Sequence, residues 1–390
     1  MSPMVAAALT WGALAVSGPA ADTTDTVVAR EVGRIGSIGG PDAITRPASL
    51  HVDPDGSLLV LFPVELIVRR MTPEGEFLET IGGRGAGPGE FLRPVGMDAH
   101  NGRVWVFETE RVSRFDLGSG EATTVRLTSR NGAPPDRMPR LSGVLPSGTL
   151  VVDREPRGVR RANDSVPLIA ATPDGSLGDT LAVVQRREIV VYQSPRPGAF
   201  GELSVPRPFP ESDLWAVHRA MPGIVVADVT SRRQHGEVVL RTYLEGGTVY
   251  DTATLQTTDT PQVSDAERRE MIRRHVDAVM WSRGLSVRSE REARSLVNDA
   301  LGTLDFRSPV ERIIAASDGT IWIKTPDDNE TVDDQTSVWL VLSPQLDPLR
   351  WVSIDADLTL LNASGDRAWA VVRDELDVSY LVELDVGTLK

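Results

Sequence analysis

Short apolar segments interrupted by glycine turns recur along the whole chain. In six places an apolar run is followed by a turn glycine and then by two to four more apolar residues; the six segments read LHVDPDGSLLVL, GMDAHNGRVWVF, GVLPSGTLVV, VHRAMPGIVVA, IIAASDGTIWI and LLNASGDRAWAVV. Two apolar runs joined by a tight turn are typical of a β-hairpin. The pattern therefore predicts a chain built mainly of hairpins.

The spacing of these turns indicates a repeat. Successive turn glycines are separated by 46, 46, 75, 96 and 46 residues, at Gly56, Gly102, Gly148, Gly223, Gly319 and Gly365. A period of roughly 40–50 residues is typical of a four-stranded propeller blade. A second turn follows each first one, which makes every unit a pair of hairpins with strands A to D. We therefore predict an all-β fold, a six-bladed β-propeller.

The predicted propeller spans residues 26–390. Its blades are expected at about 47–82, 92–127, 137–184, 205–256, 307–354 and 355–390. After three strands of the last unit only Thr388 to Lys390 remain, whereas the strand-like segment 26–36 has no hairpin partner of its own. We expect this segment to be the outer strand of blade six, because that pairing closes the ring and removes a bare sheet edge.

The two long spacings indicate insertions. The interval from Gly148 to Gly223 contains loops rich in Pro and Arg, and the interval from Gly223 to Gly319 contains a helical block. SDAE (Ser264, Glu267) reads as a capping box and SERE opens a second helix whose apolar positions repeat at helical spacing. A helical hairpin insertion is therefore predicted at 264–301, between blades four and five.

One stretch resembles a known family. FLETIGGRGAGPGEFLRPVGM (Phe77 to Met97) is similar to the junction between blades in NHL-repeat and TolB-like bacterial six-bladed propellers, and the similarity covers residues 30–127. The chain has FPVELIVRR where NHL repeats usually have an Asn-His-Arg-like stretch. The resemblance implies a binding or scaffolding platform, and for a minority of such propellers a lactonase or a lyase.

The first twenty residues read as a targeting segment. Met4 to Val16 form an apolar stretch that is too short to span a bilayer and is typical of a secretory signal peptide, although no Lys or Arg precedes it. We predict a signal peptide at 1–20 and a periplasmic or secreted location, with no membrane span.

Composition excludes several classes of protein. The chain has no Cys, which excludes a disulfide scaffold, a thiolate metal site and a Cys nucleophile. Its net charge is −14, from 41 basic and 55 acidic residues. A chain this acidic is poorly suited to bind a phosphate backbone, so nucleic acid is excluded as an expected partner. We expect a monomer.

Five arginines at the entry to strand A of successive blades are the candidate ligand-binding residues: Arg46, Arg93, Arg140, Arg207 and Arg307. Guanidinium groups around one channel mouth would bind a carboxylate, phosphate or sulfate. Alternatively each arginine pairs with a carboxylate of a neighbouring blade, such as Glu90, Glu211 or Glu311. The sequence leaves both possibilities open.

The variable loops should lie on one face of the propeller, formed by the D-to-A and B-to-C connections, and we expect the binding site there. His51 and His218 occupy equivalent places in blades one and four and are expected to pack or to form hydrogen bonds. The loop TPDDNETVDDQTS (residues 325–337) carries six possible oxygen ligands for calcium but has no EF-hand spacing.

The leading hypothesis is an exported, non-catalytic binding module for a protein or a small anionic or carbohydrate ligand. No catalytic residue, metal ligand or cofactor is assigned, and calcium stays open. The alternative is a six-bladed propeller hydrolase, lactonase-like and calcium-dependent, or a lyase. Three or more convergent oxygen ligands in the channel would favour the enzyme, whereas arginine-paired walls would favour the binder.

Overall fold

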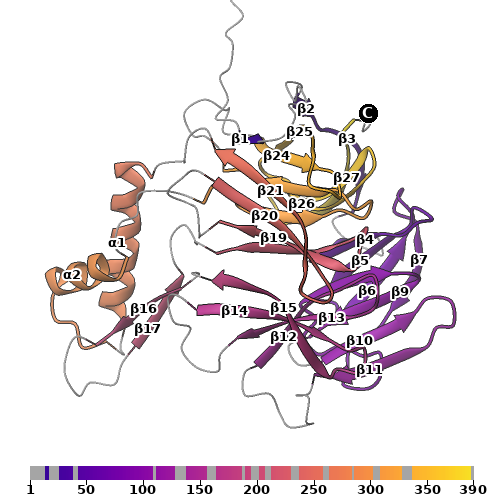
Figure 1. Cartoon of the computed structure of the whole chain (residues 1–390), viewed down its shortest axis with the longest axis horizontal. Helices are drawn as coiled ribbons and strands as arrows, with labels where there is room; N and C mark the ends of the chain where they lie inside the picture. The colour runs from indigo at the N-terminus through magenta and orange to yellow at the C-terminus, as the bar shows by residue number, and fades with distance from the viewer. Residues whose placement is uncertain are drawn as a thin grey trace, which may run out of the picture.

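The computed structural model describes residues 14–16, 26–37, 43–108, 111–127, 138–155, 164–186, 189–194, 202–206, 212–229, 237–257, 263–282, 285–301, 308–326 and 336–387. Over these ranges the chain forms six main β-sheets and two helices (Figure 1). The predicted fold class, a six-bladed β-propeller with an inserted helical hairpin, is confirmed.

Each blade is an antiparallel sheet whose strands follow one another in the chain. The first three blades contain β4 (Ser49–Val52), β5 (Leu58–Phe62), β6 (Ile67–Met71) and β7 (Phe77–Ile81); β8 (Gly96–His100), β9 (Arg103–Phe107), β10 (Arg111–Asp116) and β11 (Ala122–Arg126); and β12 (Met138–Val144), β13 (Leu150–Glu155), β14 (Asp164–Ala171) and β15 (Leu177–Arg186).

The last three blades follow the same order. They contain β18 (Leu214–His218), β19 (Gly223–Asp228), β20 (Glu237–Leu244) and β21 (Val249–Thr257); β22 (Arg312–Ala315), β23 (Ile321–Lys324), β24 (Thr336–Leu342) and β25 (Pro348–Asp355); and β26 (Thr359–Ser364), β27 (Arg367–Arg373) and β28 (Ser379–Asp385). The first strand of each blade is the innermost, and each innermost strand contacts that of the next blade, so that β26 meets β4 and the ring closes.

Hydrophobic residues fill the spaces between successive blades. Over the described ranges, six buried clusters each join one blade to the next, and the last joins blade six to blade one. Strand β5 (LLVLF) is buried at all five positions because its two faces pack on different neighbouring blades. This two-sided burial explains why the second strand of each blade reads as a continuous apolar run rather than as an alternating one.

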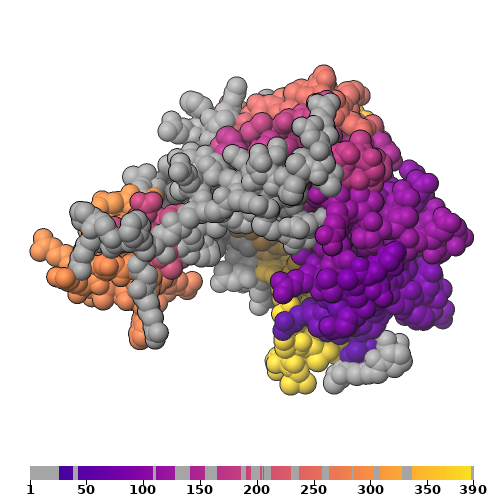
Figure 2. All heavy atoms as spheres, turned by 90° about the horizontal axis from the view of Figure 1, so that it is seen from below, coloured from indigo at the N-terminus to yellow at the C-terminus, as the bar shows by residue number. Residues whose placement is uncertain are grey.

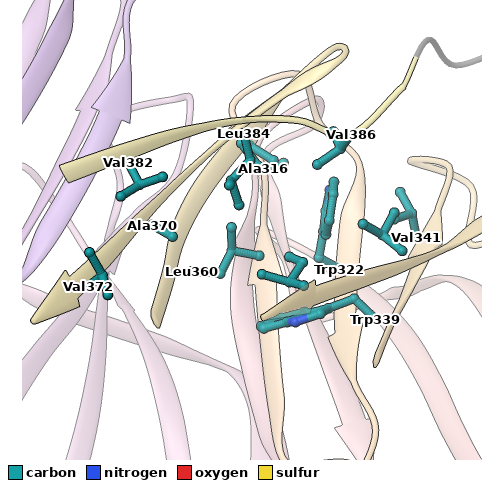
Figure 3. Packing of buried hydrophobic residues seen from close by; sticks show 14 residues of the cluster. Ala316, Trp322, Trp339, Val341, Leu360, Ala370, Val372, Val382, Leu384 and Val386 are labelled. Atoms are coloured by element: carbon teal, nitrogen blue, oxygen red, sulfur yellow. The ribbon is translucent and has the colours of Figure 1, made fainter. Parts of the chain in front are cut away.

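The cluster between blades five and six shows how buried polar atoms are satisfied (Figure 3). Trp322 and Trp339 pack edge to face with ring centroids 6.4 Å apart. The indole N–H of Trp322 donates to Thr320, and that of Trp339 donates to Ser337. In both cases the acceptor is a hydroxyl two residues earlier in the chain, and this local bond satisfies the buried indole N–H.

Two N-terminal strands complete the outer edges of the last blades. Strand β3 (Arg30–Ile35) pairs antiparallel with β28 and is the fourth strand of blade six. Strand β2 (Thr26–Val28) instead pairs in parallel with β25 of blade five. The expectation that 26–36 forms a single strand on blade six is therefore wrong for its first three residues, because the chain passes along blade five before it reaches β28.

Strand β1 (Leu14–Val16) falls within the predicted signal peptide and pairs antiparallel with β21 at the edge of blade four. The rest of that segment lies outside the described residues. No helix in the described part of the chain is long and apolar enough to cross a bilayer.

The two insertions form one lobe, which we call the side lobe: β16 (Ile189–Gln193), β17 (Glu202–Pro206), α1 (Asp265–Trp281) and α2 (Glu290–Leu301). It has its own buried cluster, which includes Tyr192, Val279 and Val297. The predicted capping box of Ser264 and Glu267 is confirmed. In Figures 1 and 2 the orange helices lie at the side of the molecule. Sequence reasoning assigned residues 193–212 to a loop and missed the hairpin of β16 and β17 on which the helices pack.

The glycine-rich junction 82–91 has a structural role. Gly82 has a φ of +82°, and a Cβ there would lie 2.2 Å from the ring of Phe91, which is fully buried. The buried Arg111 donates to Glu108 and to the carbonyl oxygens of Gly85 and Glu90. The junction is therefore held by a buried side-chain pair on the next blade and by a close contact that only glycine permits.

Candidate functional site

A cavity of about 620 Å³ lies beside the innermost strands, on the face of the propeller that carries the A-to-B and C-to-D turns. It is lined by His51, Val52, Asp53, Pro54, Gly56, Pro73, Ala99, His100, Asn101, Arg219, Ser317, Ser364, Arg367, Trp369 and Glu383. Its volume is in the range of roughly 300–1,000 Å³ that is typical of small-molecule sites. We expected the site on the opposite face, but this cavity is lined by residues in and beside the tight turns, among them the small residues Gly56, Ala99, Ser317 and Ser364.

Four polar side chains meet at the wall of this cavity. Arg219, in the turn after β18 of blade four, reaches across to Asp98 of blade two, to which its Nη1 donates. The same Nη1 lies 2.7 Å from Nε2 of His100, and the rings of His51 and His100 meet edge to face with centroids 6.1 Å apart. Three blades are thus linked across the channel by one ion pair and two imidazoles.

Burial sets the protonation of this group. Burial lowers the pKa of His51 to about 3, and the charge of Arg219 adds to the effect. Burial also lowers the pKa of His100, although Asp98 opposes it. For Asp98 burial alone would raise the pKa, but Arg219, His100 and hydrogen bonds outweigh it, so the pKa is lowered. At neutral pH both imidazoles are therefore neutral and Asp98 is charged.

We predict that His51 makes the protein sensitive to acid. The unfolded chain takes up a proton on this ring below about pH 6.5, whereas the folded chain does not until about pH 3, so stability is lost as the pH falls between these values. When the pH is lowered from 7 to 5, the titration of His51 should reduce the free energy of unfolding by about 2 kcal/mol. Urea denaturation at both values should show that His51→Gln loses about that much less than the wild type. Equal losses would contradict the assignment.

Three residues that line the cavity each carry one buried nitrogen with no hydrogen-bond partner in the described part of the chain. These atoms are Nδ1 of His51, Nε of Arg219 and Nε1 of Trp369. An unsatisfied buried polar atom costs about 1–3 kcal/mol, so it is uncommon in a folded protein. Trp369 differs from Trp322 and Trp339 because Arg367, and not a hydroxyl residue, stands two positions before it.

Two carboxylates complete the lining. Asp53 is buried, and its side-chain contacts in the described part of the chain are long: 3.5 Å to Ser57 Oγ and 3.8 Å to both His51 Nε2 and Arg70 Nη2. Glu383 lies 3.5 Å from Arg367. Burial raises the pKa of both carboxyl groups, while Arg70 opposes this at Asp53 and Arg367 opposes it at Glu383. Because His51 is neutral at pH 7, its contact with Asp53 is not an ion pair.

The cavity does not suit the calcium ion that a lactonase-like propeller implies. Calcium requires six to eight oxygen ligands, but Asp98 is already engaged by Arg219 and by the backbone N–H of Val144. Arg219 also lines the cavity, and its guanidinium charge would repel a cation there. No group of three or more His, Asp or Glu residues suited to a metal occurs in the ranges that the structure describes. The acidic segment 327–335 lies outside those ranges.

The five candidate arginines are only partly described. Arg46 is exposed and lies 3.4 Å from Asp377, and the side chain of Arg93 is exposed. The backbone of Arg140 pairs with Asp153 in blade three, while the side chain of Arg140 and all of Arg207 and Arg307 lie outside the described residues. Convergence of the five therefore stays a prediction.

The carboxylates expected to pair with these arginines have other partners where they are described. Glu90 accepts from the backbone N–H of Gly87, and Glu311 forms an ion pair of 2.8 Å with Lys324. Glu211 lies outside the described residues. The two described carboxylates thus give no support to the structural pairing that the sequence left open.

The remaining described histidines have partners of their own. Nε2 of His218 lies 3.0 Å from the carbonyl oxygen of Pro344, and its Nδ1 accepts from the backbone N–H of Ala220. This is the hydrogen-bonding role that was predicted. Nδ1 of His275 lies 2.6 Å from the hydroxyl of Tyr192 and joins α1 to β16 in the side lobe.

Sequence reasoning missed most of the cavity. It considered His51 but not Asp98, His100, Arg219 or Trp369, although all four occupy the repeat segments that identified the blades. The available signal was the presence of charged or imidazole side chains beside the A-to-B turns in DAHNG and VHRAMPG. Equivalent turns surround one channel, so polar residues beside several of them point to a shared site.

The sequence matches no protein-family model and no curated protein. Among solved structures it is similar to a candidate exported protein from Bacteroides fragilis NCTC 9343, with 10% identity, 92% of this chain and 96% of that chain covered, and a TM-score of 0.46. A PQQ-bound aldose sugar dehydrogenase from Streptomyces coelicolor has 14% identity, coverage of 92% and 98%, and a TM-score of 0.43. A calcium-binding regucalcin from Agrobacterium tumefaciens has 8% identity, coverage of 93% and 98%, and a TM-score of 0.42.

Proposed function

We propose that this protein is an exported, non-catalytic binding module whose ligand site is the cavity at the tight-turn face. The observation that carries the proposal is the cavity itself, which has a volume of about 620 Å³ and is lined by polar side chains that include Asp53, His100 and Asn101. A preformed cavity of this size with a few polar groups is typical of a small-molecule site.

The chemistry of the wall supports binding more than catalysis. A general base works best with a pKa near the working pH, but the pKa of His51 is about 3 and that of His100 is lowered. The side chain of Asp98 is paired with Arg219 and does not face the cavity as a free carboxylate. The acidic side chains Asp98 and Glu383 lie beside Arg219 and Arg367, which is the arrangement that favours a binding module. No specific observation supports the lactonase or lyase alternative.

Export rests on the apolar segment from Met4 to Val16. In the folded chain Leu14–Val16 adds only an extra edge strand to blade four, which keeps four strands without it. Cleavage after about residue 20 would therefore leave every blade complete. The N-terminal sequence of the mature protein recovered from the periplasm or the medium tests this part of the proposal.

We predict that filling the cavity abolishes ligand binding. Ser364 lines the cavity at the end of β26, and Ser364→Trp should occupy much of its volume. A panel of neutral sugars, sugar acids, amino acids and dicarboxylates should contain a compound that raises the melting temperature of the wild type. A ligand at a hundredfold excess over its Kd stabilises by about 2.7 kcal/mol, which a thermal shift assay detects.

Ser147→Trp is the matched control, because Ser147 is exposed in the corresponding turn of blade three and does not line the cavity. The control should respond to the same compound as the wild type, and Ser364→Trp should not. A panel without any active compound, or an equal shift in all three proteins, would refute this site.

A further inference from the structure

We infer that the cavity binds an ω-amino acid, a small zwitterion whose ammonium and carboxylate groups lie at opposite ends of an alkyl chain. The inference rests on the proposed function and specifies its ligand class. Its basis is the set of charged atoms that are open to the cavity: a guanidinium nitrogen from blade four and carboxylate oxygens from blades one and six.

A ligand can contact only atoms that are open to the cavity. The partnerless nitrogens Nδ1 of His51, Nε of Arg219 and Nε1 of Trp369 are enclosed by protein atoms, so they take no part in binding. Nη2 of Arg219 is not enclosed, and it forms no hydrogen bond in the part of the chain that the structure describes. Because Nη1 holds Asp98, Nη2 is left to donate to a ligand, and a carboxylate suits the permanent charge of the guanidinium.

Two carboxylates supply open acceptors. Oδ1 of Asp53 lies 3.8 Å from Nε2 of His51, which is too far for a hydrogen bond, and Arg367 approaches Glu383 only to 3.5 Å. Over the described ranges, neither Oδ1 of Asp53 nor the oxygens of Glu383 accept a hydrogen bond, and none of them is enclosed by protein. Burial raises the pKa of both carboxyl groups, because it removes water that would stabilise their charge. A ligand ammonium would donate to them and replace that water.

The charges beside Asp53 favour an ammonium and oppose a second carboxylate. Asp55 and Glu79 add negative charge near Asp53. Arg70 lies 3.8 Å from Asp53 but only 2.7 Å from Asp55, so its charge is already taken up by a closer partner. A ligand carboxylate would be repelled at this end of the cavity. We therefore expect the ammonium at Asp53 and the carboxylate at Arg219.

Two imidazole rings separate the two ends. The ring of His51 lies beside Asp53, and Nε2 of His100 lies 2.7 Å from Nη1 of Arg219. The centroids of the two rings are 6.1 Å apart. The charges of the ligand are therefore expected several bonds apart, as in ε-aminocaproate or in lysine, and not close together as in glycine. The lining also includes apolar residues that an alkyl chain would contact: Val52, Pro54, Pro73 and Ala99.

The test is calorimetric titration of the purified protein with ε-aminocaproate, lysine, hexylamine, hexanoate and glycine. Hexylamine lacks the carboxylate of ε-aminocaproate, hexanoate lacks its ammonium, and glycine carries both charges without the chain. We expect ε-aminocaproate and lysine to bind. Each of the other three should bind about tenfold more weakly or worse, because none of them places a charge at both ends of the cavity.

Two variants assign the ammonium to the named carboxylates. Asp53→Asn should weaken the binding of ε-aminocaproate about tenfold, and Glu383→Gln about threefold or more, while hexanoate, which has no ammonium, is unaffected by either. Glu375→Gln is the matched control, because Glu375 is exposed in blade six and does not line the cavity, and it should change no affinity. Circular dichroism and melting temperature confirm that the variants are folded; if Asp53→Asn unfolds, Glu383→Gln alone decides.

The outcomes separate this inference from the proposed function. If another compound of the wider panel binds and Ser364→Trp blocks it, while neither ε-aminocaproate nor lysine binds, the site stands and the ligand class is wrong. Hexylamine or hexanoate binding as tightly as ε-aminocaproate, or an affinity for ε-aminocaproate that both carboxylate variants leave unchanged, would also overturn the inference. If no compound binds at all, both proposals fail.

Discussion

Removal of residues 26–37 should lower the unfolding free energy by about 4 kcal/mol or more, because this segment holds the edges of two blades. Strand β3 covers β28, whose Leu381, Val382 and Leu384 are fully or almost fully buried. Each large apolar side chain that returns to water costs roughly 1.5–3 kcal/mol, and the bare edge of β28 would favour aggregation. Urea denaturation of chains that begin at residue 26 and at residue 38 measures the difference.

Val32→Ser in the longer chain is the matched control. Val32 lies on the same strand with 51% of its surface exposed, so its replacement should change the unfolding free energy by less than about 0.5 kcal/mol. If the shorter chain unfolds at the same urea concentration as the longer one, the N-terminal strand does not stabilise the propeller and the prediction is wrong.

Arg111→Ala should lower the unfolding free energy by about 3–5 kcal/mol, because it leaves Glu108 as a buried charge without its partner. Both side chains are nearly inaccessible, at 11% and 7% exposure. The guanidinium also donates to the carbonyl oxygens of the glycine-rich junction, and Glu108 accepts from the backbone N–H groups of Leu92 and Arg93. The substitution therefore removes the ion pair and loosens the junction at once.

The control is Arg103→Ala, in the same blade. Arg103 is half exposed and lies 3.6 Å from Asp116, so its loss should cost less than about 1 kcal/mol. The double variant Glu108→Ala with Arg111→Ala should cost less than the sum of the two single changes, since neither charge is then left alone. If Arg111→Ala is no more destabilising than Arg103→Ala, Arg111 and Glu108 do not form a stabilising buried pair.

Local signals explain why the architecture could be predicted. The apolar runs beside the turn glycines indicate hairpins, and the 46-residue spacing of these glycines indicates a repeat. A hairpin can be predicted because it depends on residues that are close in the chain. The capping box at Ser264 likewise depends on a contact between neighbours. The β16–β17 hairpin was not predicted because its strands are short and lie among prolines. Its apolar residues also pack on helices that begin about 70 residues further along the chain.

The cavity could not be predicted, because it is formed by residues that are far apart in the chain. Asp98 and Arg219 are 121 residues apart in sequence, and only the closed ring places the turn of blade four opposite the inner strand of blade two. For Trp369 the sequence shows that no hydroxyl residue stands two positions earlier, but only the folded ring shows that no other residue of the described chain replaces it as a partner.

The sequence by itself determined the number of blades, the strand order within each blade and the helical insertion, because these follow from turn chemistry and apolar periodicity over tens of residues. Only the tertiary structure decided which face carries the cavity, which polar groups meet there and which of them are left without partners. The physical reason is that burial and pairing depend on the surroundings of a side chain. In a propeller those surroundings come from blades that are far apart along the chain.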